Sequence, residues 1–159
     1  MHEELCVVPN ALAHELEQVR SGAREGTLVV FVGTTSLRTV ESYFRLGARP
    51  GAWFPTRLFV HPQENSARAC PAVGDALLTN FHQPESTLVM LVAALLGGGA
   101  WRGLYEHAIA SDYRFFSYGD ASLLLLSERA CAALGPHTAP LASRGPHEAA
   151  LARSEESDQ

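Results

Sequence analysis

A short polar corner, Thr79-Asn80-Phe81-His82, separates two apolar segments of the sequence. Asn80 can donate and accept hydrogen bonds at once, and His82 can exchange a proton near neutral pH. The corner directly follows a predicted strand, and sites in α/β proteins gather at the carboxyl ends of strands. The residue types leave two interpretations open: a site with an acid–base group, or a structural corner whose side chains satisfy buried backbone groups.

A second polar group follows an earlier predicted strand, in the sequence VGTTSLR of residues 32–38. Thr34, Thr35 and Ser36 offer hydroxyls and free amides at the start of a predicted helix, where an anion is favoured. Arg38 adds a positive charge. The alternative is a capped turn that binds nothing.

The third group lies in residues 113–120 and combines aromatic, cationic and acidic side chains. Its candidates are Tyr113, Arg114, Phe116, Tyr118 and Asp120. Arginine beside aromatic rings suits stacking on a nucleobase and binding of a phosphate or carboxylate. A turn at Gly119-Asp120 would present the acid. The alternative is a hairpin with an aromatic core and an Arg114–Asp120 ion pair.

Alternating strands and helices must position these groups, which predicts an α/β fold with a partial barrel-like or open mixed sheet flanked by helices. Hydrophobic periodicity predicts helices over residues 9–23, 37–46, 86–96 and 101–110, and strands over 27–32, 56–60, 75–79, 115–118 and 122–126. Residues 61–73 are expected to form a loop. We expect one domain over residues 1–127 and a largely disordered tail over 128–159, because the tail is rich in Ala, Pro, Gly, Ser and Glu.

Composition restricts the function classes. The chain has 159 residues and a net charge of −5, so no broad basic surface indicates nucleic-acid binding. Its three cysteines lack metal-ligand spacing, so we expect no metal and a reducing, cytoplasmic setting. The sequence shows no signal peptide and no apolar segment long enough to span a bilayer, so no membrane partner is expected.

Three segments together resemble one enzyme family: VGTTSLRTVES (residues 32–42), DALLTNFHQPESTLVMLVAAL (75–95) and HAIASDYRFFSYGDA (107–121). Their order and spacing are similar to the carboxyl-terminal half of the S-adenosylmethionine:tRNA ribosyltransferase-isomerases of queuosine biosynthesis. The resemblance extends over about residues 1–126.

The resemblance implies that the ribosyl part of S-adenosylmethionine moves to a 7-aminomethyl-7-deazaguanine in the wobble position of tRNA. Epoxyqueuosine forms, adenine and methionine leave, and no metal is needed. His82 is then the general acid–base candidate, Asn80 orients a substrate, and Asp120 bonds to a base edge or a ribose hydroxyl. The implied substrate-binding residues are Thr34, Thr35, Ser36, Arg38, Phe81, Tyr113, Arg114, Phe116 and Tyr118.

The sequence departs from the family in two respects. It is about half as long, so exposed strand edges would require self-association or a complementary amino-terminal half. Glu85 stands where the family usually has lysine, which reverses a charge near an anionic substrate. These departures leave three functions open: an active enzyme, a catalytically inactive remnant or a half that needs a second chain, and a nucleotide-binding α/β module.

Overall fold

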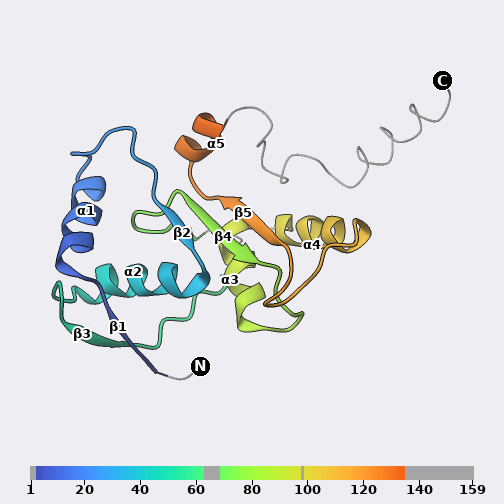
Figure 1. The fold of residues 1–159 in the computed structure, drawn as a ribbon, viewed down its shortest axis with the longest axis horizontal. Helices are drawn as coiled ribbons and strands as arrows, with labels where there is room; N and C mark the ends of the chain where they lie inside the picture. Colours follow the sequence, from blue (N-terminus) through green and yellow to red (C-terminus); the bar gives the residue numbers. More distant parts are fainter. Residues whose placement is uncertain (1–2, 63–68, 98, 135–159) are drawn as a thin grey trace.

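The structure is a computed structural model that describes residues 3–62, 69–97 and 99–134 (Figure 1). The strands are β1 (Glu4–Val7), β2 (Val30–Val32), β3 (Trp53–Thr56), β4 (Ala76–Asn80) and β5 (Ala121–Leu125). The helices are α1 (Asn10–Arg20), α2 (Thr34–Leu46), α3 (Thr87–Leu96), α4 (Ala100–Ala110) and α5 (Glu128–Leu134).

The strands form two small sheets. One has the order β2-β4-β5, in which β2 and β4 are parallel while β4 and β5 are antiparallel. The other is the antiparallel pair of β1 and β3. The predicted α/β class with an open mixed sheet flanked by helices is confirmed, and the described strands do not close into a barrel.

Local sequence explains where the central helices begin and end. Ser86 caps α3 by accepting a hydrogen bond from the backbone N–H of Val89, as the sequence predicts. Gly97 ends this helix with a positive φ of 70°. Gly33 precedes α2 with a φ of 84°, a backbone conformation that residues with a Cβ rarely adopt.

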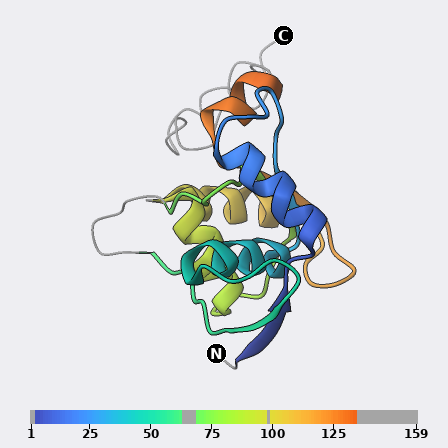
Figure 2. The ribbon, with the colours of Figure 1, turned by 90° about the vertical axis from the view of Figure 1, so that its left-hand side faces the viewer.

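One hydrophobic core joins the inner face of the three-stranded sheet to the helices. Phe31, Leu77 and Leu124 lie side by side on that face and are almost fully buried. They belong to the same core cluster as Leu91 and Leu95 of α3. Figure 2, turned by 90° from Figure 1, shows α3 and α4 next to each other, and the two helices are in contact.

Several predicted elements differ from the structure. The strand expected over residues 115–118 is wrong, because this segment forms turns in which Phe116 has a φ of 70°. The strand expected over 56–60 lies earlier, as β3, and β1 was not predicted. In the expected loop at 61–73, the residues that the structure describes form no helix or strand.

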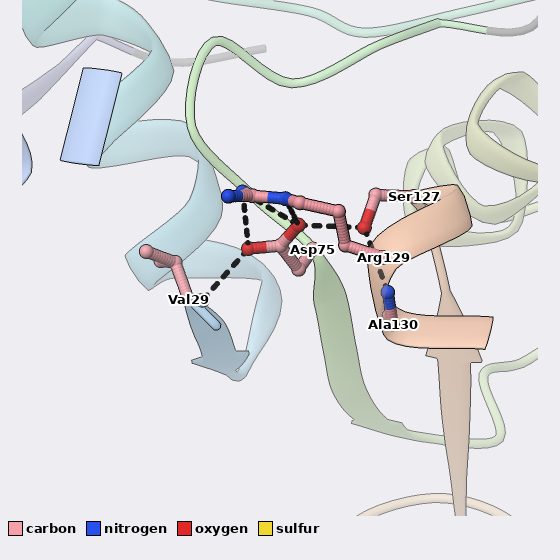
Figure 3. Close-up of polar contacts among 5 residues, drawn as sticks. All are labelled: Val29, Asp75, Ser127, Arg129 and Ala130. Carbon is pink, nitrogen blue, oxygen red and sulfur yellow. Dashed lines mark hydrogen bonds and ion pairs between the residues drawn. The ribbon is translucent and has the colours of Figure 1, made fainter. Parts of the chain in front are cut away.

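Helix α5 lies within residues 128–159, which were expected to form a largely disordered tail. Hydrogen bonds to a buried carboxylate connect this helix to the sheet. Asp75 is 1% exposed and accepts hydrogen bonds from Val29 N, Ser127 Oγ and Arg129 Nη2 (Figure 3). Ser127 Oγ in turn accepts from Ala130 N in the first turn of α5. The folded unit therefore extends to this helix. The rest of the expected tail, residues 135–159, lies outside the described residues.

Among the described helices, none is by itself long and apolar enough to cross a membrane. Within the described ranges, α3 and α4 taken together are long and apolar enough to do so, but the chain bends by 119° between them.

Candidate functional site at the carboxyl ends of β2 and β4

The first two polar groups meet because β2 and β4 are parallel neighbours. Their carboxyl ends lie at the same edge of the sheet. Gly33 N donates a hydrogen bond of 2.9 Å to Leu78 O, which brings the start of α2 beside the end of β4. Thr34 therefore begins its helix next to the strand that ends at Asn80.

The third group joins the same edge because β5 is antiparallel to β4 and begins there. Asn80 is paired with Ala121, and Phe81 N donates to Asp120 O at 3.2 Å. The loop between α4 and β5 also bonds directly to the corner. Phe116 N donates to Phe81 O at 3.0 Å, and Asn80 Nδ2 donates to Phe116 O at 3.2 Å.

His82 supplies the imidazole of this edge. Its side chain is half-buried, and its Nε2 lies 2.9 Å from Thr79 Oγ1. Burial lowers the pKa of His82 below its ordinary value of 6.5, because a partly desolvated imidazole disfavours the charged form. The imidazole is therefore neutral at pH 7 and able to accept a proton.

Tyr105 supports the corner from α4. Its hydroxyl accepts a hydrogen bond of 3.2 Å from His82 N. Burial raises the pKa of Tyr105, and the bond from His82 N lowers it by a smaller amount, so the hydroxyl stays protonated. Tyr105 cannot be recognised as a site residue from the sequence, because nothing in the local pattern links residues 23 positions apart. Thr79, in contrast, could be identified from the sequence because it belongs to the polar corner of residues 79–82.

The loop over residues 112–120 presents its aromatic side chains at different depths. Phe81 is in the core, in contact with the rings of Tyr113 and Phe115. Phe116 is 57% exposed and Tyr118 is 96% exposed. Both are available to a large ligand, whereas the buried Phe81 supports the corner from the inside. Because the Phe81 side chain is buried, the predicted contact between its ring and a substrate is not supported by this structure.

Asp120 closes this loop on Arg114. One oxygen of its carboxylate accepts a 2.7 Å hydrogen bond from Arg114 N, and the other lies 3.6 Å from Arg114 Nη2. The ion pair that the alternative interpretation of this group predicted is therefore present, although the segment is not a hairpin. The guanidinium remains largely exposed, and both carboxylate oxygens face Arg114.

The three hydroxyl-bearing residues at the start of α2, Thr34, Thr35 and Ser36, lie only partly at this edge of the sheet. Thr35 and Ser36 are exposed, and Ser36 Oγ donates back to Val32 O at 3.0 Å. Arg38 is 8% exposed and lies against another part of the fold, where it bonds to Leu58 O and pairs with Glu4. The structure therefore does not place Arg38 with the exposed hydroxyls.

No group of three or more His, Cys, Asp or Glu side chains within the described ranges is arranged to hold a metal ion. The candidate groups at this edge are hydroxyls, an amide, an imidazole, a guanidinium and aromatic rings. Such a set suits an organic substrate that carries charge and flat rings.

Fold and site together define an α/β domain with a polar and aromatic candidate site at the carboxyl ends of parallel strands. The family model described as "Queuosine biosynthesis protein" matches residues 1–124, and the chain belongs to this family.

Curated relatives carry the name S-adenosylmethionine:tRNA ribosyltransferase-isomerase. The protein from Cereibacter sphaeroides is 46% identical over 125 residues, which cover 79% of this chain and 34% of the relative. The protein from Acinetobacter baylyi is 44% identical over 126 residues, which cover 78% of this chain and 34% of the relative. This chain thus spans about a third of the length of the curated relatives that it matches.

A solved structure of a protein with a similar name also matches this chain. The S-adenosylmethionine tRNA ribosyltransferase from Thermotoga maritima superposes with a TM-score of 0.61 at 39% identity. The match covers 77% of this chain and 40% of the Thermotoga chain.

Proposed function

We propose that this chain supplies one part of an S-adenosylmethionine:tRNA ribosyltransferase-isomerase. The complete reaction would transfer the ribosyl moiety of S-adenosylmethionine to 7-aminomethyl-7-deazaguanine in tRNA and isomerise it, which gives epoxyqueuosine. The family membership and the names of the relatives support this assignment. A tRNA substrate would place the chain in the cytoplasm.

The observation that carries the proposal is the meeting of three distant segments at one sheet edge. The hydrogen bond from Gly33 N to Leu78 O joins the first two segments, and the pairing of Asn80 with Ala121 joins the third. Local interactions within each segment do not require this meeting. A two-substrate reaction does require it, because donor and acceptor groups must be held in one place.

His82 is the proposed general base and acid. It is neutral at pH 7 because burial lowers its pKa, so it can take a proton from the carbon beside the sulfonium or from the ammonium arm of the deazaguanine. Thr79 orients the ring by holding Nε2, which leaves Nδ1 for the substrate. Asn80 would orient the substrate through its side-chain oxygen, since its Nδ2 is bonded to Phe116 O.

The loop over residues 112–120 is the proposed contact with the tRNA base. Phe116 and Tyr118 expose rings on which a nucleobase or adenine can stack. Arg114 would bind a phosphate or carboxylate, and its pairing with Asp120 holds the guanidinium at the loop. Asp120 therefore serves mainly to position Arg114. To bond to a base edge or a ribose hydroxyl, as predicted, one of its carboxylate oxygens would have to leave Arg114.

Thr34, Thr35 and Ser36 are proposed to hold a phosphate or the methionyl carboxylate with the first amides of α2. Backbone N–H groups at a helix start favour an anion. Glu85 lies in the turn after the corner and is exposed, so its negative charge would weaken tRNA binding at this edge.

The experiment is a chimera, because the chain spans about a third of its relatives. Residues 1–134, which include α5, replace the matching segment of the Cereibacter sphaeroides relative, and release of adenine from S-adenosylmethionine is measured with tRNA that carries the modified base. We expect turnover, and we expect His82→Ala to lower kcat at least a hundredfold. The matched control His14→Ala changes an exposed histidine of α1 and should leave kcat within twofold.

The other functions are outcomes of the same assay. A folded chimera that binds both substrates but releases no adenine would show that this segment is a catalytically inactive remnant. A chain that binds nucleotides but neither S-adenosylmethionine nor tRNA would be a nucleotide-binding module. Near-normal turnover of His82→Ala would remove His82 from the mechanism.

A further inference from the structure

Phe116 has a backbone conformation that bulky residues avoid. Its φ of 70° lies in the left-handed region, which among the other described non-glycine residues only Glu85 and Asp112 share. Aspartate tolerates this region because its short polar side chain can hydrogen-bond to nearby backbone, whereas phenylalanine has no such compensation. The conformation of Phe116 is therefore imposed by its surroundings, and such outliers cluster where a ligand is held.

Three hydrogen bonds hold the backbone of Phe116. Its N–H donates to Phe81 O at 3.0 Å, and its carbonyl accepts from Asn80 Nδ2 at 3.2 Å and from Gly119 N at 3.0 Å. Both polar groups of the Phe116 backbone are thus directed at the corner after β4 and at its own loop. The side chain is left at the surface, where Phe116 is 57% exposed.

The same contacts orient the amide of Asn80. A carbonyl oxygen can only accept a hydrogen bond, so the bond to Phe116 O fixes Nδ2 on that side of the amide and Oδ1 on the other. No residue in the described part of the chain donates to Oδ1, and Asn80 is only half-buried. An accessible acceptor of fixed direction therefore lies beside the residue that carries the exposed ring.

We propose that Phe116 and Asn80 form a subsite for a flat heterocycle with an exocyclic amino group. The heterocycle stacks on the Phe116 ring, and its amino group donates to Asn80 Oδ1, as asparagine accepts from adenine in other complexes. Stacking is tolerant of the base, so the selectivity comes from the fixed acceptor. This inference rests on the proposed function, whose substrates contain two such heterocycles, adenine and a deazaguanine.

Tyr118 offers a second exposed ring, but it lacks the anchoring that Phe116 has. Tyr118 is 96% exposed, so its side chain has almost no contact with the rest of the described chain. A free side chain loses rotamer freedom when it is ordered by a ligand, and this loss reduces affinity. The backbone of Phe116 is already fixed by its bonds to Asn80 and Phe81. The subsite therefore belongs to Phe116 and not to Tyr118.

Nucleoside binding to the full 159-residue chain tests the acceptor, with the NMR signals of the Asn80 amide as the readout. Adenosine and purine riboside differ only in an amino group, and so do guanosine and inosine. In at least one pair we expect the amino-bearing nucleoside to bind about fivefold more tightly, because its analogue leaves Oδ1 unpaired. The pair that shows the preference identifies the source as the adenine of S-adenosylmethionine or the base of tRNA.

Asn80→Ala should make the affinities within that pair equal, even if it weakens both through the lost contact with Phe116. Circular dichroism checks that the variant keeps its fold. Equal affinities within both pairs for the unaltered chain would overturn the proposal. So would a preference that survives in Asn80→Ala, or an Asn80 amide whose signals do not move at millimolar nucleoside.

Phe116→Leu and Phe116→Trp test the stacking surface. Both variants keep a Cβ, so both keep the cost of the left-handed backbone, but only tryptophan keeps an aromatic ring. Phe116→Leu should weaken the preferred nucleoside about fivefold or more, whereas Phe116→Trp should bind it at least as tightly as the unaltered chain. The matched control Tyr118→Leu should change the affinity less than about twofold. Equal weakening by Tyr118→Leu would overturn the assignment to Phe116.

These measurements do not depend on turnover, so the two proposals can fail separately. An active chimera together with no preference for an amino group would overturn the subsite and leave the proposed function standing. An inactive chimera together with a preference that Asn80→Ala abolishes would support the subsite and count against the proposed function.

Discussion

Arg129 donates from Nη2 to both carboxylate oxygens of Asp75, at 2.9 and 3.0 Å, and thereby fastens α5 to the start of β4 (Figure 3). The carboxylate is buried, whereas the arginine side chain is 53% exposed. Asp75 also accepts hydrogen bonds from Val29 N and Ser127 Oγ. A single side chain therefore connects the segment before β2, the start of β4 and the start of α5.

Asp75→Ala should destabilise the fold by about 1–3 kcal/mol, because it leaves Val29 N without an acceptor, whereas the half-exposed Arg129 can be solvated by water. Urea denaturation followed by circular dichroism measures the change. The control is Glu128→Ala, at an exposed neighbouring position in α5, for which we expect less than about 0.5 kcal/mol. A similar loss in both variants would show that α5, and not the carboxylate, carries the effect.

Gly119→Ala should disrupt the aromatic loop. A Cβ at this position would lie 2.4 Å from Arg114 O and 2.6 Å from Phe115 O, both backbone atoms that cannot move without opening the loop. We expect a loss of about 1–3 kcal/mol and weaker tRNA binding by the chimera. Gly103→Ala is the matched control. Its Cβ would meet nothing within 4 Å, and the helical position predicts a gain of about 1 kcal/mol. Tolerance of Gly119→Ala would contradict the tight closure of the loop by Asp120.

His82 should make stability depend on pH. Its pKa is lowered in the folded state because of burial, so the unfolded state binds more protons between the folded pKa and 6.5. The free energy of unfolding should therefore fall as pH drops below 6.5 and level off below the folded pKa. Urea denaturation between pH 4.5 and 8 measures this dependence. His82→Gln should reduce the slope. Equal slopes for the unaltered chain and His82→Gln would show that the imidazole is not desolvated.

Glu85→Gly should stabilise the chain. Ser86 N bonds to Gln83 O across a turn in which Pro84 precedes Glu85, and Glu85 has a φ of 63°. This is the third position of a type II pattern, which favours glycine. We expect a gain of about 0.5–1 kcal/mol, since left-handed backbone costs an ordinary residue about 1–2 kcal/mol. Thermal denaturation checks it.

The control for that change is Glu106→Gly in α4, where the same substitution falls inside a helix. It should destabilise by about 1 kcal/mol, because glycine lowers helix propensity. If both substitutions destabilise, the strain at Glu85 is too small to matter.

Glu85→Lys tests the effect of charge alone. It should raise the affinity of the active chimera for tRNA, and more strongly at low salt.

Features of this fold that depend on near neighbours in the chain could be predicted from the amino-acid sequence. The apolar run after Ser86 with Gly97 at its end predicted α3 and its cap, since both require only local hydrogen bonds and periodic burial. The apolar run of β2 and the corner after β4 were predicted for the same reason. The family motifs were also readable, because their residues are contiguous.

Tertiary structure alone decided which of these pieces meet. Tyr105 reaches His82 N, and Arg38 turns to Glu4 and Leu58, through contacts between residues far apart in the chain. The aromatic segment over residues 115–118 has strand-like composition, yet Asp120 and the tight approach at Gly119 bend it into turns. Neighbouring residues set local propensity, but only long-range pairing, here of Asn80 with Ala121, fixes where a segment lies. For that reason the three groups were predictable one by one, and their common edge was not.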